Sequence, residues 1–131
     1  VEILNSGSAH FNLMHCVSSY PCPNNQINLQ RLEWLSSLSK EIGFSDHTKS
    51  TIIPALSLVY GVTVIEKHFT TDNTLPGRDN ENALEPKEFR LMVDNILEAE
   101  DSNISCGIDY QDIESDTVMN YRGRWEPHDY E

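Results

Sequence analysis

The 131-residue sequence predicts an α/β fold built on a parallel sheet. Short apolar runs alternate with segments of helical periodicity, in the order strand, loop, helix, repeated three times. The apolar runs are continuous, as expected of strands in a parallel sheet whose connecting helices cover it. Such an order favours right-handed crossovers between parallel strands. Three units of this kind fit either an open sheet or part of a (β/α)₈ barrel.

The first unit begins with FNLMHCV, residues 11–17, a short apolar run that predicts a buried strand. A Pro and Asn cluster, SSYPCPNNQ, then predicts a loop. Asn28 is a suitable N-cap for a helix of about three turns. Leucines every third residue would form the apolar side of this helix, namely Leu29, Leu32, Leu35 and Leu38.

The second unit has a strand in IGFS, residues 42–45, and a helix in TIIPALSLVYG, with Pro54 in its first turn and Gly61 at its end. The third has the clearest strand, VTVIEKHF at residues 62–69, which is rich in β-branched residues. A polar loop then leads to the amphipathic helix EPKEFRLMVDNILEAE, residues 85–100.

We therefore divide the chain into a partial barrel domain, residues 1–100, and an acidic tail, residues 101–131. The tail has no clear period and is interpreted either as a docking segment or as partly disordered. Overall, 9 Lys and Arg stand against 21 Asp and Glu, for a net charge of −12. Such a surface repels phosphate backbones, so nucleic acid is not an expected partner.

Two further features of the composition bear on location. No apolar run approaches the roughly 20 residues that a membrane span needs, so we expect no membrane association. The N-terminal residues lack the pattern of a signal peptide. The 3 cysteines follow no paired spacing, which indicates reduced thiols and a cytoplasmic protein.

The side chains that could bind a ligand or take part in catalysis lie at or just beyond the carboxyl ends of the predicted strands. This is the edge at which α/β folds bind ligands. His47 lies just beyond the end of one predicted strand and His68 at the end of the next, and parallel neighbouring strands lie about 5 Å apart, so the two imidazoles can face one pocket. Two imidazoles completed by water suit a divalent ion such as Mn, Fe, Co or Zn. Surface or hydrogen-bonded core histidines are the competing interpretation. The other residues at this edge are Tyr20, Ser45, Asp46, Glu66 and Asp79.

Hydroxyls near His47 also admit two interpretations. Ser45 and Thr48 flank this histidine ahead of a predicted helix, where they would suit an anion such as phosphate. Plain N-capping is the simpler interpretation of the same residues. Asp46 is interpreted as a partner of a neighbouring site residue or as solvated. His15, inside a strand, is expected to be a hydrogen-bonded core histidine.

Together these motifs resemble those of the sialic acid synthase family, the N-acetylneuraminate synthases and their bacterial relatives. The matching segments are LMHCVSSYPCP, GFSDHT, VIEKHFT and LPGRDNENALEP with the helix that follows, over about residues 11–100. The resemblance implies a (β/α)₈ barrel, of which this chain holds the last three units. It implies condensation of phosphoenolpyruvate with an N-acyl amino sugar, such as N-acetylmannosamine, to a nine-carbon 2-keto sugar acid with release of phosphate.

The resemblance also implies roles for individual residues. His47 and His68 look like the ligands of a divalent metal, Mn²⁺ or Mg²⁺. Glu66, the residue expected to be catalytic, looks like the acid that helps hold the water shell of the metal. Ser45 looks like a phosphate contact. The residues that look like amino-sugar contacts are Tyr20, Ser18 and Asp79.

Two other functions remain open at this point. The chain could be a catalytically inactive remnant that binds a metal or a partner. A metal-dependent hydrolase on a related barrel would need a third strong ligand, and no H-x-H or H-E-x-x-H pattern supplies one. Because an open three-stranded sheet exposes two edges and an apolar face, we expect a homo-oligomer or association with the missing half of the barrel.

Overall fold

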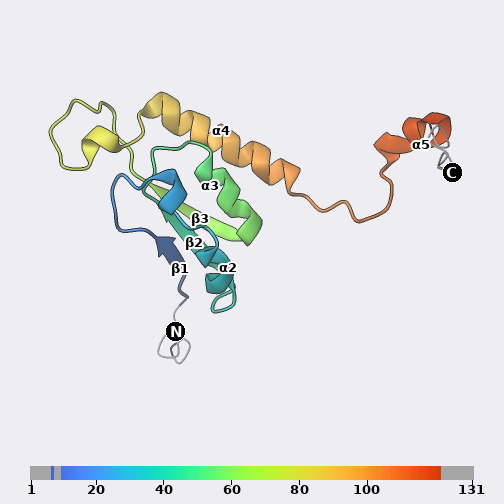
Figure 1. The fold of residues 1–131 in the computed structure, drawn as a ribbon, viewed down its shortest axis with the longest axis horizontal. Helices are drawn as coiled ribbons and strands as arrows, with labels where there is room; N and C mark the ends of the chain where they lie inside the picture. The colour runs from blue at the N-terminus through green and yellow to red at the C-terminus, as the bar shows by residue number, and fades with distance from the viewer. Residues whose placement is uncertain (1–6, 8–9, 122–131) are drawn as a thin grey trace, which may run out of the picture.

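A computed structural model describes residue 7 and residues 10–121 of the chain. Three strands form one parallel sheet in the order β1-β2-β3, which confirms the predicted α/β class (Figure 1). The last ten residues of the predicted tail lie outside the described residues. The strands are β1 (Leu13–Cys16), β2 (Ile42–Asp46) and β3 (Val62–Lys67).

The register aligns the carboxyl ends of all three strands. Cys16 of β1 lies opposite Ser45 of β2, which in turn lies opposite Glu66 of β3. The next pair along is Asp46 and Lys67. Because parallel strands end at one edge of a sheet, the residues that follow them share that edge. β2 is central and buried along its whole length, as its apolar sequence predicts.

The helix of the first unit is shorter than predicted. Helix α2 spans Arg31–Ser36, six residues, instead of about three turns from Asn28. Asn28 does not cap it, because its backbone has a positive φ of 49° and forms a turn ahead of the helix. At the other end, Ser36 and Ser37 donate their hydroxyl protons to carbonyls three residues earlier. Such local bonds offer the backbone an alternative to continued helix, and α2 ends there.

The second crossover matches its predicted signals. Helix α3 (Ile53–Leu56) has Pro54 in its first turn and continues as the 3₁₀-helix η2 (Ser57–Tyr60). It ends at Gly61, whose φ of 79° is the left-handed conformation that glycine adopts without a Cβ penalty. A short 3₁₀-helix, η1 (Asn24–Gln26), also forms within the loop of the first unit.

The third crossover leads into the longest helix. Helix α4 spans Pro86–Ser102, and a reciprocal capping box between Glu85 and Glu88 satisfies its first amides. The loop before it contains the 3₁₀-helix η3 (Asn80–Asn82). Helix α4 packs against α3, and Asn95 donates a hydrogen bond of 3.0 Å to the carbonyl of Thr51.

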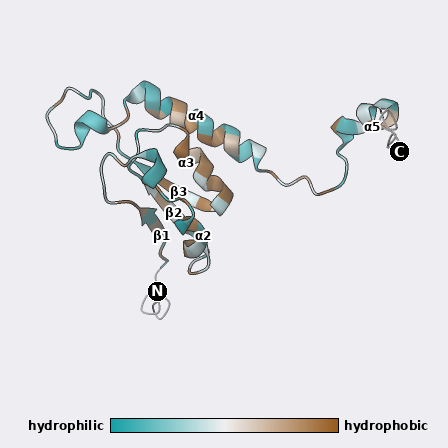
Figure 2. Cartoon of the chain, in the orientation of Figure 1, coloured by the Kyte–Doolittle hydropathy of each residue, from teal (hydrophilic) through white to brown (hydrophobic). Residues whose placement is uncertain are grey.

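The core lies between the sheet and its helices. Figure 2 shows hydrophobic residues concentrated on the strands and α3, whereas α4 is mixed. The opposite face of the sheet is more open, with Met14 and Val64 38% and 41% exposed. The buried cluster consists of Cys22, Ile27, Leu32, Leu35, Ile42, Phe44, Ile53 and Val62.

The tail leaves the body of the protein after α4 (Figure 1). It contains the 3₁₀-helix η4 (Asp112–Glu114) and helix α5 (Ser115–Tyr121), two elements that its aperiodic sequence did not predict. Nearly all its described side chains are exposed. Among the described residues, no helix has both the length and the apolarity needed to cross a membrane.

Candidate functional site

Two histidines meet at the carboxyl edge of the sheet. His47 follows the last residue of β2, and His68 follows the last residue of β3. Their ring centroids are 5.1 Å apart, with the ring planes at 76° to each other. Both side chains are half-buried. The parallel register therefore brings together the two imidazoles that the sequence placed at neighbouring strand ends.

Tyr20, from the loop after β1, covers this histidine pair. Its ring stacks on His68 at a centroid distance of 4.1 Å and meets His47 edge-on at 5.4 Å. Burial raises the pKa of Tyr20 to about 12, and the charges of Asp79 and Asp46 act in the same direction. The hydroxyl oxygen is buried and has no hydrogen-bond partner in the described part of the protein. Buried polar atoms are nearly always paired, so this hydroxyl is suited to a bound group.

Cys16 is a third side chain at the same place, and the sequence interpretation missed it. Its Sγ lies 3.7 Å from Nε2 and 3.9 Å from Nδ1 of His47. From the sequence, this cysteine was expected only to be a reduced thiol. Its position as the last residue of β1 was the available signal, because the register sets it beside Ser45, two residues before the histidine.

Ser45 and Glu66 form a second pair beside the histidines. The Ser45 hydroxyl donates a hydrogen bond of 2.6 Å to Oε1 of Glu66. Ser45 is buried and Glu66 is exposed. This bond holds the carboxylate of Glu66, two residues before His68, at the solvent-exposed side of the sheet edge.

Ser18 and Asp79, the other predicted contacts, lie on exposed loops. Asp79 is close enough for its charge to contribute to the raised pKa of Tyr20. For Ser18 the structure gives no contact with the histidine pair. The edge therefore gathers the two histidines, Tyr20, Ser45 and Glu66 most closely, with Asp79 at its periphery.

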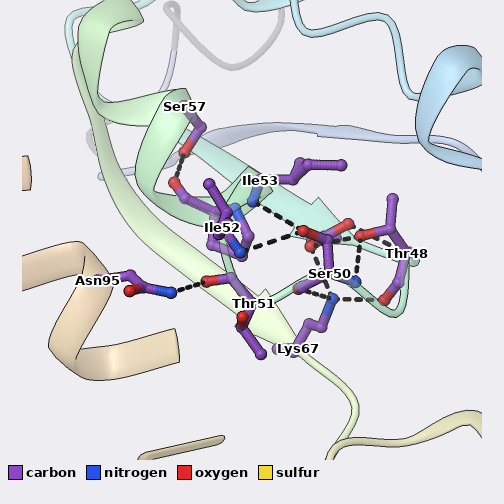
Figure 3. A network of polar contacts seen from close by, with 10 residues as sticks. Thr48, Ser50, Thr51, Ile52, Ile53, Ser57, Lys67 and Asn95 are labelled. Atoms are coloured by element: carbon purple, nitrogen blue, oxygen red, sulfur yellow. Dashed lines mark hydrogen bonds and ion pairs between the residues drawn. The ribbon is translucent and has the colours of Figure 1, made fainter. Parts of the chain in front are cut away.

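A buried ion pair supports the loop that carries His47. Nζ of Lys67 lies 2.7 Å from Oδ2 of Asp46, and the two side chains are 3% and 0% exposed. The ammonium also donates to the carbonyls of Thr48 and Ser50 (Figure 3). Burial lowers the pKa of Lys67, while the hydrogen bond and charge of Asp46 oppose that shift. Asp46 is thus buried and paired with Lys67 and Thr48 and is not solvated, and the contacts of Lys67 were not predicted.

The hydroxyls ahead of α3 form local hydrogen bonds within the loop. Ser50 Oγ accepts hydrogen bonds from the amides of Ile52 and Ile53, at 3.1 and 3.2 Å (Figure 3). Thr48 Oγ1 accepts the amide of Ser50 and donates to Asp46. These bonds lie within the loop ahead of α3, whose N-cap is Ile52 and has no side-chain capping bond, so neither Ser45 nor Thr48 is the N-cap of this helix.

His15 is a core histidine, as expected from its place inside a strand. It is 4% exposed, and its Nε2 lies 2.7 Å from the carbonyl oxygen of Ile27. Its ring stacks on Phe44 at 5.9 Å.

The donor set at the edge fits a particular kind of metal. Among the described residues, no group of three or more His, Cys, Asp or Glu side chains is arranged to hold a metal ion. A closed structural zinc site, which needs four protein ligands, is therefore not formed by these residues. His47 and His68 offer two imidazoles beside the hydroxyl of Tyr20, which no described residue bonds. This set fits a divalent ion that keeps water or substrate in its remaining positions.

Comparisons with known proteins identify a matching family and several similar chains. The model of the NeuB family matches residues 1–106. The chain is 39% identical over 97 residues to N,N'-diacetyllegionaminic acid synthase of Legionella pneumophila, covering 73% of this chain and 27% of that protein. It is 42% identical over 97 residues to the spore coat polysaccharide biosynthesis protein SpsE of Bacillus subtilis, covering 72% of this chain and 26% of that protein.

A solved structure is also similar to the chain. The crystal structure of N-acetylneuraminic acid synthetase from Leptospira borgpetersenii, in complex with citrate, superposes with a TM-score of 0.80 at 35% identity. The match covers 94% of this chain and 43% of that one. Across the curated relatives, the matched region spans only 25% to 29% of their length. The likeness therefore concerns one part of a longer synthase fold.

Proposed function

Because this chain belongs to the NeuB family, we propose that it forms the metal- and sugar-facing part of a sialic-acid-type synthase. The proposed reaction condenses phosphoenolpyruvate with an N-acyl amino sugar, such as N-acetylmannosamine, to a nine-carbon 2-keto sugar acid. The observation that carries the proposal is the contact of His47, His68 and Tyr20 at one edge of the sheet. The relatives named as synthases of such acids support it.

The atoms of this reaction balance with one water. A carbon–carbon bond joins the methylene carbon of phosphoenolpyruvate to the aldehyde carbon of the sugar, whose oxygen becomes a hydroxyl. Water adds to the carbon that bears the phosphate, and phosphate leaves. The enzyme must therefore place two substrates and one water together. Such positioning lowers the activation free energy by several kcal/mol.

His47 and His68 would hold Mn²⁺ or Mg²⁺, a Lewis acid that can polarise the aldehyde oxygen when bound. Each histidine needs one neutral ring nitrogen directed to the ion. Cys16, at 3.7 Å from His47, limits how far that ring can turn. The half-buried setting keeps bulk water from part of the site and strengthens its electrostatic interactions.

The remaining residues would bind and orient the substrates. The hydroxyl of Tyr20 has no hydrogen-bond partner among the residues that the structure describes, so it can donate to a sugar oxygen without breaking a bond to any of them. Ser45 can donate to phosphate only by turning away from Glu66, because its proton is shared with that carboxylate. Glu66 would then be free to hold a water molecule or take a proton. Asp79, on its exposed loop, would contact the sugar's hydroxyls.

An activity assay tests this proposal. The chain is incubated with phosphoenolpyruvate, N-acetylmannosamine and Mn²⁺, and phosphate release is followed, with His47→Ala and His68→Ala as controls. We expect turnover that both substitutions abolish. Turnover that survives both would contradict the proposed role of the histidines. Absence of turnover together with Mn²⁺ binding that needs both histidines would favour the alternative function, an inactive metal-binding remnant.

We also propose that the chain associates with a copy of itself or with further barrel units. The support is the open face of the sheet, where Met14, Gly43 and Val64 lie in register. Within the described residues, the outer edges of β1 and β3 have no strand partner. Exposed edges and apolar faces favour association. A monomer by light scattering at assay concentration would count against this proposal.

The cysteines bear on the compartment. The three thiols are free, and only Cys106 is fully exposed. Free thiols are typical of a reducing compartment, so we propose a cytoplasmic protein. Localisation of a tagged chain by fractionation would test this.

A further inference from the structure

Lys67 makes an unusual set of contacts for a residue at the end of a strand. Its ammonium reaches Oδ2 of Asp46 at 2.7 Å and the carbonyl of Ser50 at 3.1 Å, and it also bonds the carbonyl of Thr48. Asp46 is the last residue of β2, and the two carbonyls lie in the loop that connects β2 to α3 (Figure 3). His47 lies in the chain between Asp46 and Thr48, two of the three acceptors. One buried side chain therefore ties β3 to both flanks of this histidine.

The register explains why this tie matters for the histidine pair. Asp46 and Lys67 are partners on neighbouring strands, and His47 and His68 are the next residues on each. Successive side chains of a strand point to opposite faces. The ion pair thus lies one residue before each imidazole and on the other side of the sheet, where it joins the two strand ends.

We propose that Lys67 is a positioning residue, whose three bonds hold the loop after β2 so that His47 stays against His68. The consequence for metal binding rests on the proposed function, because it takes the two histidines as the metal ligands. The positioning itself does not depend on a metal.

A purely stabilising ion pair would not need this geometry. Buried ion pairs are weak evidence of stability, since desolvation offsets much of the attraction. Here two of the three acceptors are backbone carbonyls, of Thr48 and Ser50, beyond the last paired residues of β2. A backbone carbonyl without a ladder partner needs another donor when it is buried. Lys67 provides that donor, and the path of the loop follows from it.

The main test uses a paired substitution. Lys67→Met alone would leave Asp46 buried and unpaired, which is strongly destabilising and could prevent folding. The double variant Asp46→Asn/Lys67→Met removes both charges, and the asparagine oxygen can still accept the Thr48 amide, now 2.8 Å from Asp46 Oδ1. The two loop carbonyls lose the ammonium in either case.

A matched control removes an ion pair that is remote from the site. Arg90→Met breaks the bond between Arg90 and Asp94, which are 2.8 Å apart on the surface of α4 with side chains 71% and 50% exposed. Each protein is measured in two ways. The nuclear Overhauser effect between the rings of His47 and His68 is recorded without metal, and Mn²⁺ affinity is measured by calorimetry.

We expect the wild-type chain and Arg90→Met to show the ring contact and the same Mn²⁺ affinity. We expect the double variant to lose the ring contact and to bind Mn²⁺ at least about tenfold more weakly, as is typical when partners that orient metal ligands are removed. A folded double variant that keeps the ring contact would overturn the positioning role. Loss of the contact with unchanged Mn²⁺ affinity would overturn its consequence for metal binding.

The two readouts also separate this inference from the proposed function. A wild-type chain that shows the ring contact but binds no Mn²⁺ would contradict the metal role of the histidines. In that case loss of the contact in the double variant would still support Lys67 as the residue that holds His47 in place.

Discussion

The carboxyl edge of the sheet and the tail after α4 differ in how their polar groups are satisfied. At the edge, bonds join residues 21 positions apart in sequence, as between Ser45 and Glu66 or Asp46 and Lys67. In the described part of the tail, hydrogen bonds join residues two to four positions apart, as between Ser115 and Asp112. Order at the edge therefore depends on the whole fold, whereas order in the tail is local. Substitutions in the two regions should have very different effects.

The largest difference is expected from the same substitution in each region. Ile42 of β2 is 1% exposed, whereas Ile108 of the tail is fully exposed. We expect Ile42→Ala to lower the free energy of unfolding by about 2–5 kcal/mol, through lost burial and the cavity that remains. We expect Ile108→Ala to change it by less than about 0.5 kcal/mol. Urea unfolding measures both, and equal effects would contradict the contrast.

The close approach of the strands offers a second test. A Cβ at Gly43 would lie 2.7 Å from Cγ of Met14 and 3.2 Å from the carbonyl oxygen of Val64. We expect Gly43→Ala to cost about 1–3 kcal/mol of unfolding free energy, as overpacking does. Adding Met14→Ala should restore only part of it, since the contact with the backbone oxygen remains. Full stability in Gly43→Ala would mean that the strands are not this close.

A smaller effect is expected where one side chain links α4 to the site loop. Asn95→Ala removes the bond to the carbonyl of Thr51, and we expect a loss of about 1 kcal/mol in thermal or urea unfolding. Arg90→Ala, on the same helix, breaks only the exposed pair with Asp94 and should cost about 0.3–0.5 kcal/mol. A larger loss for Arg90 than for Asn95 would reverse the expected order.

The smallest effect is expected from a local bond in an exposed loop. Hydrogen bonds from the hydroxyl and amide of Thr74 hold the pKa of Asp72 below its ordinary value. A lowered carboxyl pKa stabilises the fold above the pKa of the unfolded chain, and this contribution disappears as the pH falls through the folded value. Asp72→Ala should therefore be slightly less stable than the wild type at neutral pH. The difference should vanish in acid, as a pH series of thermal unfolding would show.

Local pattern and register were enough to predict where His47 and His68 lie. The predicted strands, 42–45 and 62–69, placed His47 just beyond one carboxyl end and His68 at the other, although β3 ends two residues earlier than predicted, at Lys67. Parallel pairing then requires the two histidines to share one edge. The role of Lys67 could not be predicted in this way. A lysine near the end of a strand is normally solvated, and its burial depends on Asp46 and on two loop carbonyls.

The shorter α2 and the ordered tail show a similar limit. Leucine spacing predicted a helix from Asn28, but the backbone of that residue adopts a left-handed turn. Asparagine is among the residues that tolerate this conformation, so its presence did not distinguish a cap from a turn. In the tail, α5 is short and its side chains are mostly exposed. An apolar stripe facing a core, the usual signal of a helix, is therefore missing from its sequence.

The central claim is that His47 and His68 together hold a divalent metal. Calorimetric titration of the chain with Mn²⁺ tests it most directly, with the variants His47→Ala and His68→Ala. The control is His10→Ala, whose side chain is exposed and precedes the amino end of β1, whereas the pair lies at the carboxyl edge. We predict one Mn²⁺ site per chain, lost in each of the first two variants and kept in the third. Mn²⁺ binding that survives both His47→Ala and His68→Ala would contradict the claim.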